Sequence, residues 1–250
     1  MGQPLSARLR PMNESTYRQQ PVSFVRRGSR LQGRRQKAWE EHSERYLLEV
    51  PRLVADTSVH PDYRFDAAKV FGRSAELVVE VGSGLGEAIV HAASTQPDRD
   101  FLAVEVYLPG LAQTIQRAAA QELSNLRVVQ ANAPEVLSSM IPAGSISEVW
   151  TFFPDPWPKS KHEKRRLVTV SFAELVATSL APGGLWRLAT DWEHYAEQML
   201  EVGSNSSLRN VHPDWAPRFE GRVITSFENK AQLAGREIHD LTFQKELPTK

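Results

Sequence analysis

The segment that decides the fold is residues 76–94, ELVVEVGSGLGEAIVHAAS. Its first part is a short apolar run, typical of a buried strand, that leads into a turn with three glycines. From Glu87 onward the apolar spacing is that of a helix. A buried strand, a glycine turn and a helix in direct succession predict the first unit of a parallel α/β sheet.

Strands and helices alternate along the rest of the chain. Strands are predicted at 76–84, 100–106, 126–132, 147–153, 185–190 and 240–245. Helices are predicted at 35–48, 87–94, 111–123 and 165–184, the last closed by Pro182 and the Gly183-Gly184 pair. This order predicts an α/β, Rossmann-like sheet that is mostly parallel and covered on both faces. Such sheets bind their ligands at the carboxyl ends of the strands.

Charge is distributed unevenly along the chain. Residues 1–37 carry nine basic and one acidic side chain, a net charge of +8, while the remainder carries 21 basic and 29 acidic side chains, a net charge of −8. Residues 1–35 are also polar and interrupted by proline and glycine. We therefore expect a basic, disordered arm at 1–35 and one folded domain at 36–250. Such an arm is typical of nucleic-acid binders, and a solvated tail is the alternative.

The composition excludes several classes of protein. The 250 residues include no cysteine, which removes disulfides, cysteine-ligated zinc and a cysteine nucleophile. No apolar run approaches the length of a membrane span, and the start lacks the apolar core of a signal peptide, so we expect a cytoplasmic protein. A transit peptide is the alternative for the arginine-rich start. The seven histidines show no metal-ligand spacing, and no metal site is predicted.

The glycine turn predicts the type of cofactor. Gly82, Gly84 and Gly86 permit a tight turn and the close approach of a ligand to the backbone. Glu87 stands where a dinucleotide-binding turn has its third glycine, which disfavours a nicotinamide cofactor. Nearby carboxylates favour a positively charged ligand, and the sulfonium of S-adenosylmethionine carries such a charge.

Polar residues stand at the ends of successive predicted strands. Glu80 precedes the turn, and Glu105 ends the second strand, where a carboxylate accepts hydrogen bonds from ribose hydroxyls. Asn132 ends the third strand, where an amide reads an adenine edge, and Asp155 follows the fourth. The expected cofactor-binding residues are Glu80, Gly82, Gly84, Gly86, Glu105, Asn132 and Asp155. The structural alternative for Glu80 is a partnership with a buried polar group.

Residues 152–166, FFPDPWPKSKHEKRR, place an acid beside a strip of cations. Asp155 lies between two prolines that restrict its backbone. The cations are Lys159, Lys161, Lys164, Arg165 and Arg166. The last four predict a strip that contacts RNA phosphates, each adding salt-dependent affinity, and a solvated helix start is the alternative. Trp157 is expected either to stack on a base or to pack internally.

Six blocks of this sequence resemble the bacterial tRNA (guanine-N7-)-methyltransferases. They are VVEVGSGLGE, FLAVEVYLPGL, NLRVVQANAPEVL, FFPDPWPKSKHEKRRL, ATDWEHYAEQML and TSFE. The similarity covers about residues 75–245 in order, and the combination of FPDPWPK…KRR with TDWxxYA is specific to that family. The resemblance implies a class I S-adenosylmethionine-dependent fold with a seven-strand sheet. It also implies methylation of the variable-loop guanosine of tRNA, position 46, to 7-methylguanosine.

The resemblance also implies roles for individual residues. Cofactor contacts of the family fall on Glu80, Glu105, Asn132 and Asp155, although many members have an acid at the Asn132 position. Substrate contacts fall on Lys159, Asp191, Thr225, Ser226, Phe227 and Glu228, and members often have lysine where this chain has Ser226. Phe227 would stack on the guanine and Glu228 would accept from its Watson–Crick edge. Asp191 would hold the base or ribose, or instead cap the helix that follows it.

The chemistry of guanine makes Asp155 the expected catalytic residue. N7 carries an in-plane lone pair and no proton, so its attack on a sulfonium methyl requires alignment and no general base. The purine gains positive charge as the methyl arrives. A fixed carboxylate at Asp155 would stabilise that charge, or hold the guanine through N1–H and N2–H.

Two other functions compete with this prediction. A non-catalytic RNA-binding protein would keep the fold and bind tRNA, but the complete set of Glu80, Glu105 and Asp155 argues against it. An amino-methyltransferase on adenine or glutamine would have Asn or Asp before two prolines and an aromatic residue. This chain has Pro-Asp-Pro-Trp instead. Both a monomer and a homodimer are compatible with the sequence.

Overall fold

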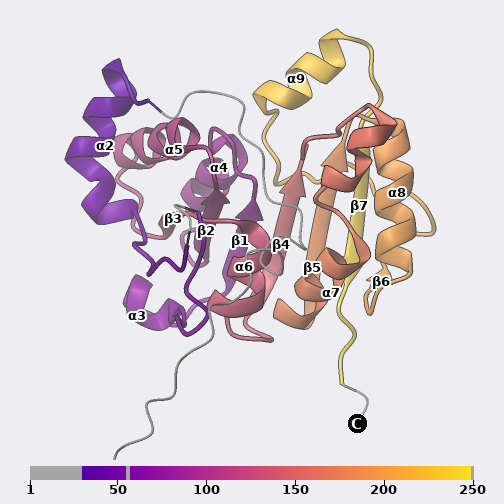
Figure 1. Ribbon diagram of the computed structural model, residues 1–250, viewed down its shortest axis with the longest axis horizontal. Helices are drawn as coiled ribbons and strands as arrows, with labels where there is room; N and C mark the ends of the chain where they lie inside the picture. Colours follow the sequence, from indigo (N-terminus) through magenta and orange to yellow (C-terminus); the bar gives the residue numbers. More distant parts are fainter. Residues whose placement is uncertain (1–29, 55–56, 249–250) are drawn as a thin grey trace, which may run out of the picture.

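A seven-strand sheet forms the centre of the computed structural model, which describes residues 30–54 and 57–248 (Figure 1). The strand order is β3-β2-β1-β4-β5-β7-β6. The strands are β1 Leu77–Val81, β2 Asp100–Glu105, β3 Leu126–Gln130, β4 Ile146–Phe152, β5 Leu180–Thr190, β6 Arg209–Asn210 and β7 His239–Gln244. β1 to β5 are parallel, and β7 runs antiparallel to both β5 and β6. This confirms the predicted mostly parallel sheet.

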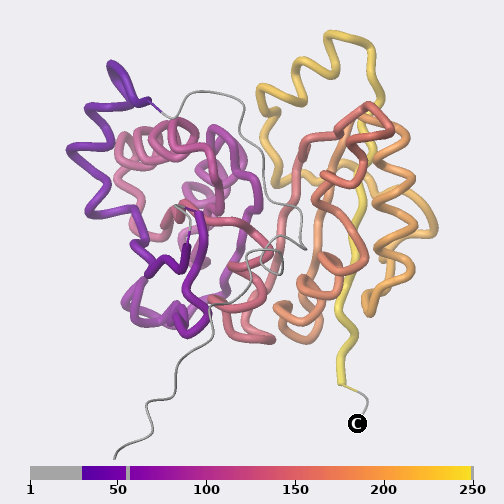
Figure 2. The backbone as a smooth tube through the Cα atoms, in the orientation of Figure 1, coloured from indigo at the N-terminus to yellow at the C-terminus, as the bar shows by residue number. Residues whose placement is uncertain are grey.

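Helices pack on both faces of the sheet, as the backbone trace also shows (Figure 2). They are α2 Gly33–Tyr46, α3 Ala67–Phe71, α4 Glu87–Thr95, α5 Leu108–Ala120, α6 Ala133–Glu135, α7 Val170–Ser179, α8 Glu193–Ser204 and α9 Ser226–Leu233. The described residues also form two short irregular helices, η1 Val136–Met140 and η2 Ser160–Arg165. Among the helices described, none combines the length and the apolar character that a membrane span requires.

The hydrophobic core has two parts because successive strand residues point to opposite faces. In β1, Val79 and Val81 belong to the part of the core that includes residues of α7 and α8, while Val78 belongs to the part that includes residues of α4 and α5. All five residues of β1 are buried, as the apolar run predicts for a central strand. The side chain of Glu80 is on the face of Val78, the side of α4.

The predicted helix at 165–184 is wrong at both ends. α7 begins at Val170, where the Thr169 hydroxyl accepts from the Phe172 N–H, and it ends at Ser179. β5 begins one residue later and contains Pro182, Gly183 and Gly184. A Cβ on Gly184 would lie 3.1 Å from the carbonyl oxygens of Ile146 and Ser147. The glycine pair therefore permits the close approach of β5 to β4, at a shift in strand register, and does not close a helix.

The structure describes the first predicted helix in full, but it describes only the last residues of the predicted basic arm at 1–35. α2 begins at Gly33, two residues before its predicted start at Arg35, and ends at Tyr46. Residues 1–29 of the predicted arm lie outside the described residues. The two-residue strand β6 was not predicted, because it is too short to show a periodic pattern.

Candidate active site

A cavity of about 610 Å³ opens at the carboxyl ends of β1, β2 and β4. The glycine turn forms one part of its lining, and residues 152–158 form another. Thr225 and Phe227, at the beginning of α9, also line the cavity. The topology therefore brings together three regions that are far apart in the sequence, at the edge of the sheet where a ligand was predicted.

The three glycines of the turn all have positive φ, and they serve different purposes. φ is 73° at Gly82, 56° at Gly84 and 70° at Gly86. A Cβ on Gly86 would lie 2.4 Å from the hydroxyl oxygen of Thr114 in α5, so this glycine is required by helix packing. A Cβ on Gly82 would meet no atom within 4 Å. Gly82 lines the cavity and leaves room for a ligand beside the backbone.

Glu105 holds the glycine turn in place. One of its carboxylate oxygens accepts from the backbone N–H groups of Val106 and Tyr107, at 2.7 and 2.9 Å. The other accepts from the N–H of Gly84 at 2.8 Å. Burial raises the pKa of Glu105, an effect that these backbone donors oppose. The oxygen that faces Gly84 keeps a lone pair for a ribose hydroxyl.

Glu80 has the chemistry expected of a cation-binding residue. It is buried, and its Oε2 has no hydrogen-bond partner among the described residues, as is also true of Ser83 Oγ beside it. Burial raises the pKa of Glu80 to about 8, and the charges of Glu105 and Glu87 add to the increase. A buried carboxylate with an unpartnered oxygen in a cavity wall is costly unless a ligand compensates it. This property fits a sulfonium cofactor.

Asn132 does not line the cavity. It follows β3, and its backbone N–H donates to the carbonyl of Thr57 at 2.8 Å. Its side-chain Oδ1 is buried and has no partner among the described residues. The adenine contact expected for Asn132 stays a prediction.

The loop that carries Asp155 has an unusual backbone. Phe153 and Trp157, on either side of the Pro-Asp-Pro sequence, have positive φ of 50° and 43°. Such values are strained for bulky residues and concentrate at functional sites. Asp155 is exposed in the cavity wall. Trp157 also lines the cavity, and it packs with the Arg165 guanidinium 5.0 Å from its ring centroid.

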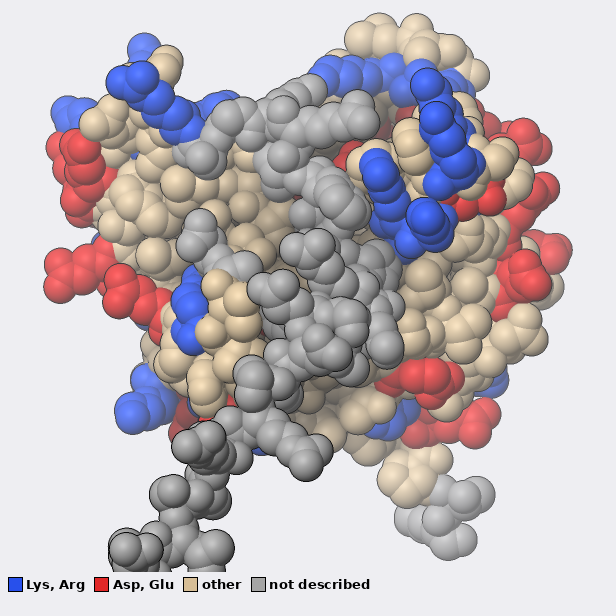
Figure 3. All heavy atoms as spheres, viewed as in Figure 1, with Lys and Arg blue, Asp and Glu red and all other residues tan. Residues whose placement is uncertain are grey.

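The predicted RNA-binding strip divides into exposed and buried residues. Lys159, Lys161 and Lys164 are exposed, and Arg165 is partly buried. Figure 3 shows blue side chains gathered at the upper right of the molecule, where Figure 1 has the segment after β4 and α9. Arg166 is only 1% exposed. Its assignment to the strip is therefore wrong, because a buried guanidinium does not reach a phosphate in solvent.

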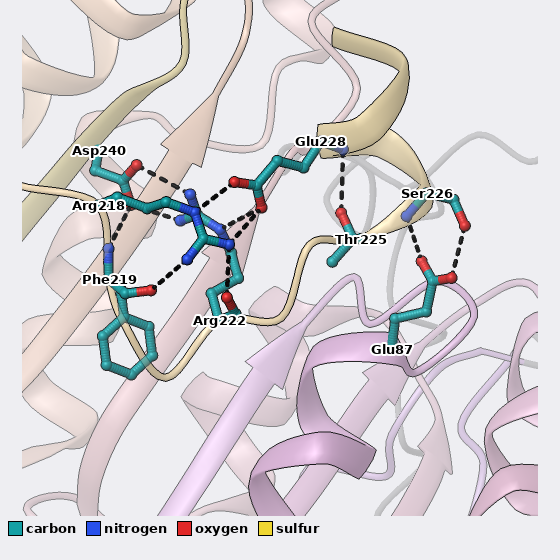
Figure 4. Close-up of polar contacts among 8 residues, drawn as sticks. All are labelled: Glu87, Arg218, Phe219, Arg222, Thr225, Ser226, Glu228 and Asp240. Atoms are coloured by element: carbon teal, nitrogen blue, oxygen red, sulfur yellow. Dashed lines mark hydrogen bonds and ion pairs between the residues drawn. The ribbon is translucent and has the colours of Figure 1, made fainter. Parts of the chain in front are cut away.

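The TSFE segment, residues 225–228, lies at the beginning of α9, and its residues have different roles. The Thr225 hydroxyl caps the helix by accepting from the N–H of Glu228 at 3.2 Å. Ser226 donates its N–H and its hydroxyl to Glu87, at 2.7 and 2.6 Å (Figure 4). Phe227 is 54% exposed and lines the cavity, as expected of a residue that stacks on a base.

Glu228 does not line the cavity. It is fully buried, and its carboxylate accepts from Arg218 and Arg222 at 2.6 to 3.1 Å (Figure 4). Arg222 is itself paired with the Asp240 carboxylate of β7. Burial opposes ionisation of Glu228, but the two arginines outweigh it and lower its pKa. This arrangement does not support the expected contact of Glu228 with a Watson–Crick edge.

Asp191 lies at a different cavity. Its Oδ2 accepts from Arg236 Nε at 2.7 Å, and both residues line a second cavity of about 400 Å³ with His194 and His239. The N-cap of α8 is Trp192, without a side-chain capping bond. The capping alternative for Asp191 is therefore wrong, and its substrate contact stays a prediction.

The sequence prediction missed Glu87 as a site residue. Glu87 lines the cavity at the beginning of α4 and bonds Ser226 and Arg117. The only local signal was its place in the glycine turn, where a dinucleotide-binding protein has glycine.

The strand order, the glycine turn and the carboxylates around it define a class I S-adenosylmethionine-dependent methyltransferase. The 16S rRNA methyltransferase KamB has the same fold, with a TM-score of 0.55 at 16% identity over 79% of this chain and 98% of that one. A structure titled as an antibiotic-related methyltransferase gives a TM-score of 0.51 at 14% identity over 80% of this chain and 100% of that one.

Sequence comparison identifies the family. A family model described as "Putative methyltransferase" matches residues 74–241. The tRNA (guanine-N(7)-)-methyltransferase of Paenarthrobacter aurescens is 52% identical over 92% of this chain and 93% of the relative. That of Cutibacterium acnes is 45% identical over 90% of this chain and 83% of the relative. The chain belongs to the tRNA (guanine-N7-)-methyltransferase family.

Proposed function

We propose that this protein transfers a methyl group from S-adenosylmethionine to N7 of the variable-loop guanosine of tRNA, position 46, to give 7-methylguanosine. The observation that carries the proposal is the cavity itself. Its lining includes the carboxylate of Glu80, whose Oε2 has no hydrogen-bond partner among the described residues, the carboxylates of Glu105 and Asp155, and the exposed ring of Phe227. A cationic cofactor suits the carboxylates of this lining, and a planar base suits the exposed aromatic ring. We place the activity in the cytoplasm.

Residues of the glycine turn would bind the cofactor. Glu80 lies where it would compensate a positive charge, and Glu105 offers one free lone pair to a ribose hydroxyl. The open space beside Gly82 allows close approach to the backbone. When bound, S-adenosylmethionine supplies a methyl group on a sulfonium.

Other residues of the cavity lining would position the guanine. Phe227 presents a ring for stacking, and Asp155 presents a carboxylate held in a constrained loop. The guanine N7 needs no base to attack the methyl, so the contribution of the protein is alignment and stabilisation of the charge that develops on the purine. We assign that stabilisation to Asp155.

The exposed lysines near the cavity would bind the tRNA backbone. Lys159, Lys161 and Lys164 lie directly after the loop of Asp155. Phosphate contacts fix the position and orientation of a nucleic acid and carry no sequence information. The +8 segment at 1–37 would add long-range attraction for the same polyanion.

The proposal is tested by incubating the protein with unmodified tRNA and methyl-labelled S-adenosylmethionine, and mapping the labelled nucleotide. We expect label only at N7 of the variable-loop guanosine. The matched control is the same tRNA with adenosine at that position, which should take up no label. Label on an amino group would indicate an amino-methyltransferase. Binding of tRNA and cofactor without any transfer would indicate a non-catalytic RNA-binding protein.

A further inference from the structure

Arg166 is the one cation of the segment 159–166 whose side chain is buried. Its Nε donates to the carbonyl oxygen of Pro156 at 2.8 Å. One terminal nitrogen donates to Gln198 Oε1 at 2.6 Å and lies 3.1 Å from His194 Nδ1. The guanidinium also stacks over the ring of Tyr195, 4.9 Å from its centroid. Arg166 thus joins the loop after β4 to helix α8.

The loop that Arg166 holds needs external support. Pro154 and Pro156 have no N–H, so the segment offers few donors to its surroundings. The positive φ values of Phe153 and Trp157 are strained for bulky residues and persist only where neighbouring contacts impose them. At the start of the loop the Phe153 N–H donates to the carbonyl of Ala189 at 2.7 Å. At its end the Pro156 carbonyl is bound by Arg166.

We propose that Arg166 is a positioning residue, which fixes the Pro156 carbonyl to α8 and thereby holds the adjacent carboxylate of Asp155 in place against the substrate. The inference rests on the proposed function and adds a role that differs from phosphate binding. Arginine suits this place because its planar group offers divergent donors and a stacking face. A lysine ammonium would replace the charge but not this combination of contacts.

The test compares Arg166→Gln with Lys164→Gln, which removes an exposed cation from the same segment. For Arg166→Gln we expect the single-turnover rate at saturating tRNA and cofactor to fall by about 10- to 100-fold, because a small misplacement of a reacting group lowers a rate by this order. Its tRNA affinity and the salt dependence of that affinity should match the parent. For Lys164→Gln we expect instead a weaker tRNA affinity, with a salt slope lower by about one. Arg166→Lys should not restore the rate.

A double-mutant cycle with Asp155→Asn separates positioning from a general effect on folding. If Arg166 acts through Asp155, adding Arg166→Gln to Asp155→Asn should slow the reaction little further. Independent, multiplying effects on the rate would overturn the proposal, as would a parental rate combined with a reduced salt slope in Arg166→Gln. If Arg166→Gln does not fold, Gln198→Leu removes a partner of Arg166 without changing charge, and the same cycle applies. A parent protein that methylates no tRNA would contradict the proposed function instead.

Discussion

The carboxylate of Glu87 accepts two hydrogen bonds from Ser226, a residue 139 positions further along the chain. Glu87 begins α4 directly after the glycine turn, and Ser226 begins α9. Burial opposes ionisation of Glu87, but the donors of Ser226 and Arg117 outweigh it and lower its pKa. The contact therefore ties the glycine-turn part of the cavity to the segment that carries Phe227.

Ser226→Ala should loosen α9 without unfolding the protein. The change removes the hydroxyl donor to Glu87 and leaves the backbone donor, so we expect unfolding to become easier by about 1 kcal/mol. Amide hydrogen exchange in α9 should become faster, and tRNA affinity should fall. Ser171→Ala, an exposed serine of α7, is the control and should change neither. Parental exchange rates in α9 would mean that the contact with Glu87 does not anchor this helix.

Glu228→Gln should act mainly on stability. The substitution removes a buried negative charge from between Arg218 and Arg222, and breaking a buried ion pair in this way costs about 3–5 kcal/mol. Urea denaturation measures this loss, and Glu220→Gln, at an exposed position, should change stability little. A parental unfolding curve with a raised KM for tRNA would instead restore the role of Glu228 as a base-reading residue.

Cofactor binding should depend on the protonation of Glu80. Because burial raises the pKa of Glu80 to about 8, the ligand-free site holds a proton at pH 7. A sulfonium favours the carboxylate, so binding at pH 7 should release this proton, and affinity should rise as the pH increases toward about 8. Calorimetry in buffers of different ionisation enthalpy detects the released proton. Glu80→Gln should bind the cofactor weakly and without this pH dependence.

The same pKa has an opposite effect on the stability of the ligand-free protein. The folded state binds the Glu80 proton more tightly than the unfolded state, so the free energy of unfolding should fall as pH rises from about 4.5 to about 8. Glu80→Gln should flatten this part of the stability curve. Identical curves for the parent and the variant would show that Glu80 does not carry a raised pKa.

Asp155→Asn should reduce turnover by roughly 10²–10³, because it removes a preorganised charge partner while the flanking prolines keep the loop. Affinity for cofactor and tRNA should fall far less, since the interaction strengthens only in the transition state. Single-turnover rates at saturating tRNA and cofactor measure the effect. If Asp155 mainly binds the cofactor, the loss will appear in cofactor affinity and disappear at saturation.

Replacing both Lys161 and Lys164 by glutamine should weaken tRNA binding. It should also lower the salt slope of that binding by about two, one for each phosphate contact. The modified nucleotide should stay the same, because phosphate contacts do not specify a base. Lys69→Gln is the control, since Lys69 is exposed on α3, at the opposite edge of the sheet (Figure 1). An equal loss of affinity in the control would indicate non-specific attraction.

The sequence alone determined the sheet and the approximate position of the cavity. Strand and helix periods are local properties, and the run ending at Val81 is apolar enough to be a central strand. Parallel strands bring their carboxyl ends to one edge, so Glu80, Glu105 and Asp155 had to meet there once the strands were assigned. The glycine turn and the carboxylates could therefore be predicted to lie together at this cavity.

Only the tertiary structure decided which charged side chains face solvent. Arg166 and Lys164 are neighbours in one basic run, yet the first is buried against α8 and the second is exposed. Glu228 and Glu87 likewise find their partners through packing, and for Glu87 the partner is 139 residues away. Charge is a property of the residue, whereas burial depends on which distant element packs against it. The division between contacts that hold the site together and contacts available to the tRNA follows from that packing.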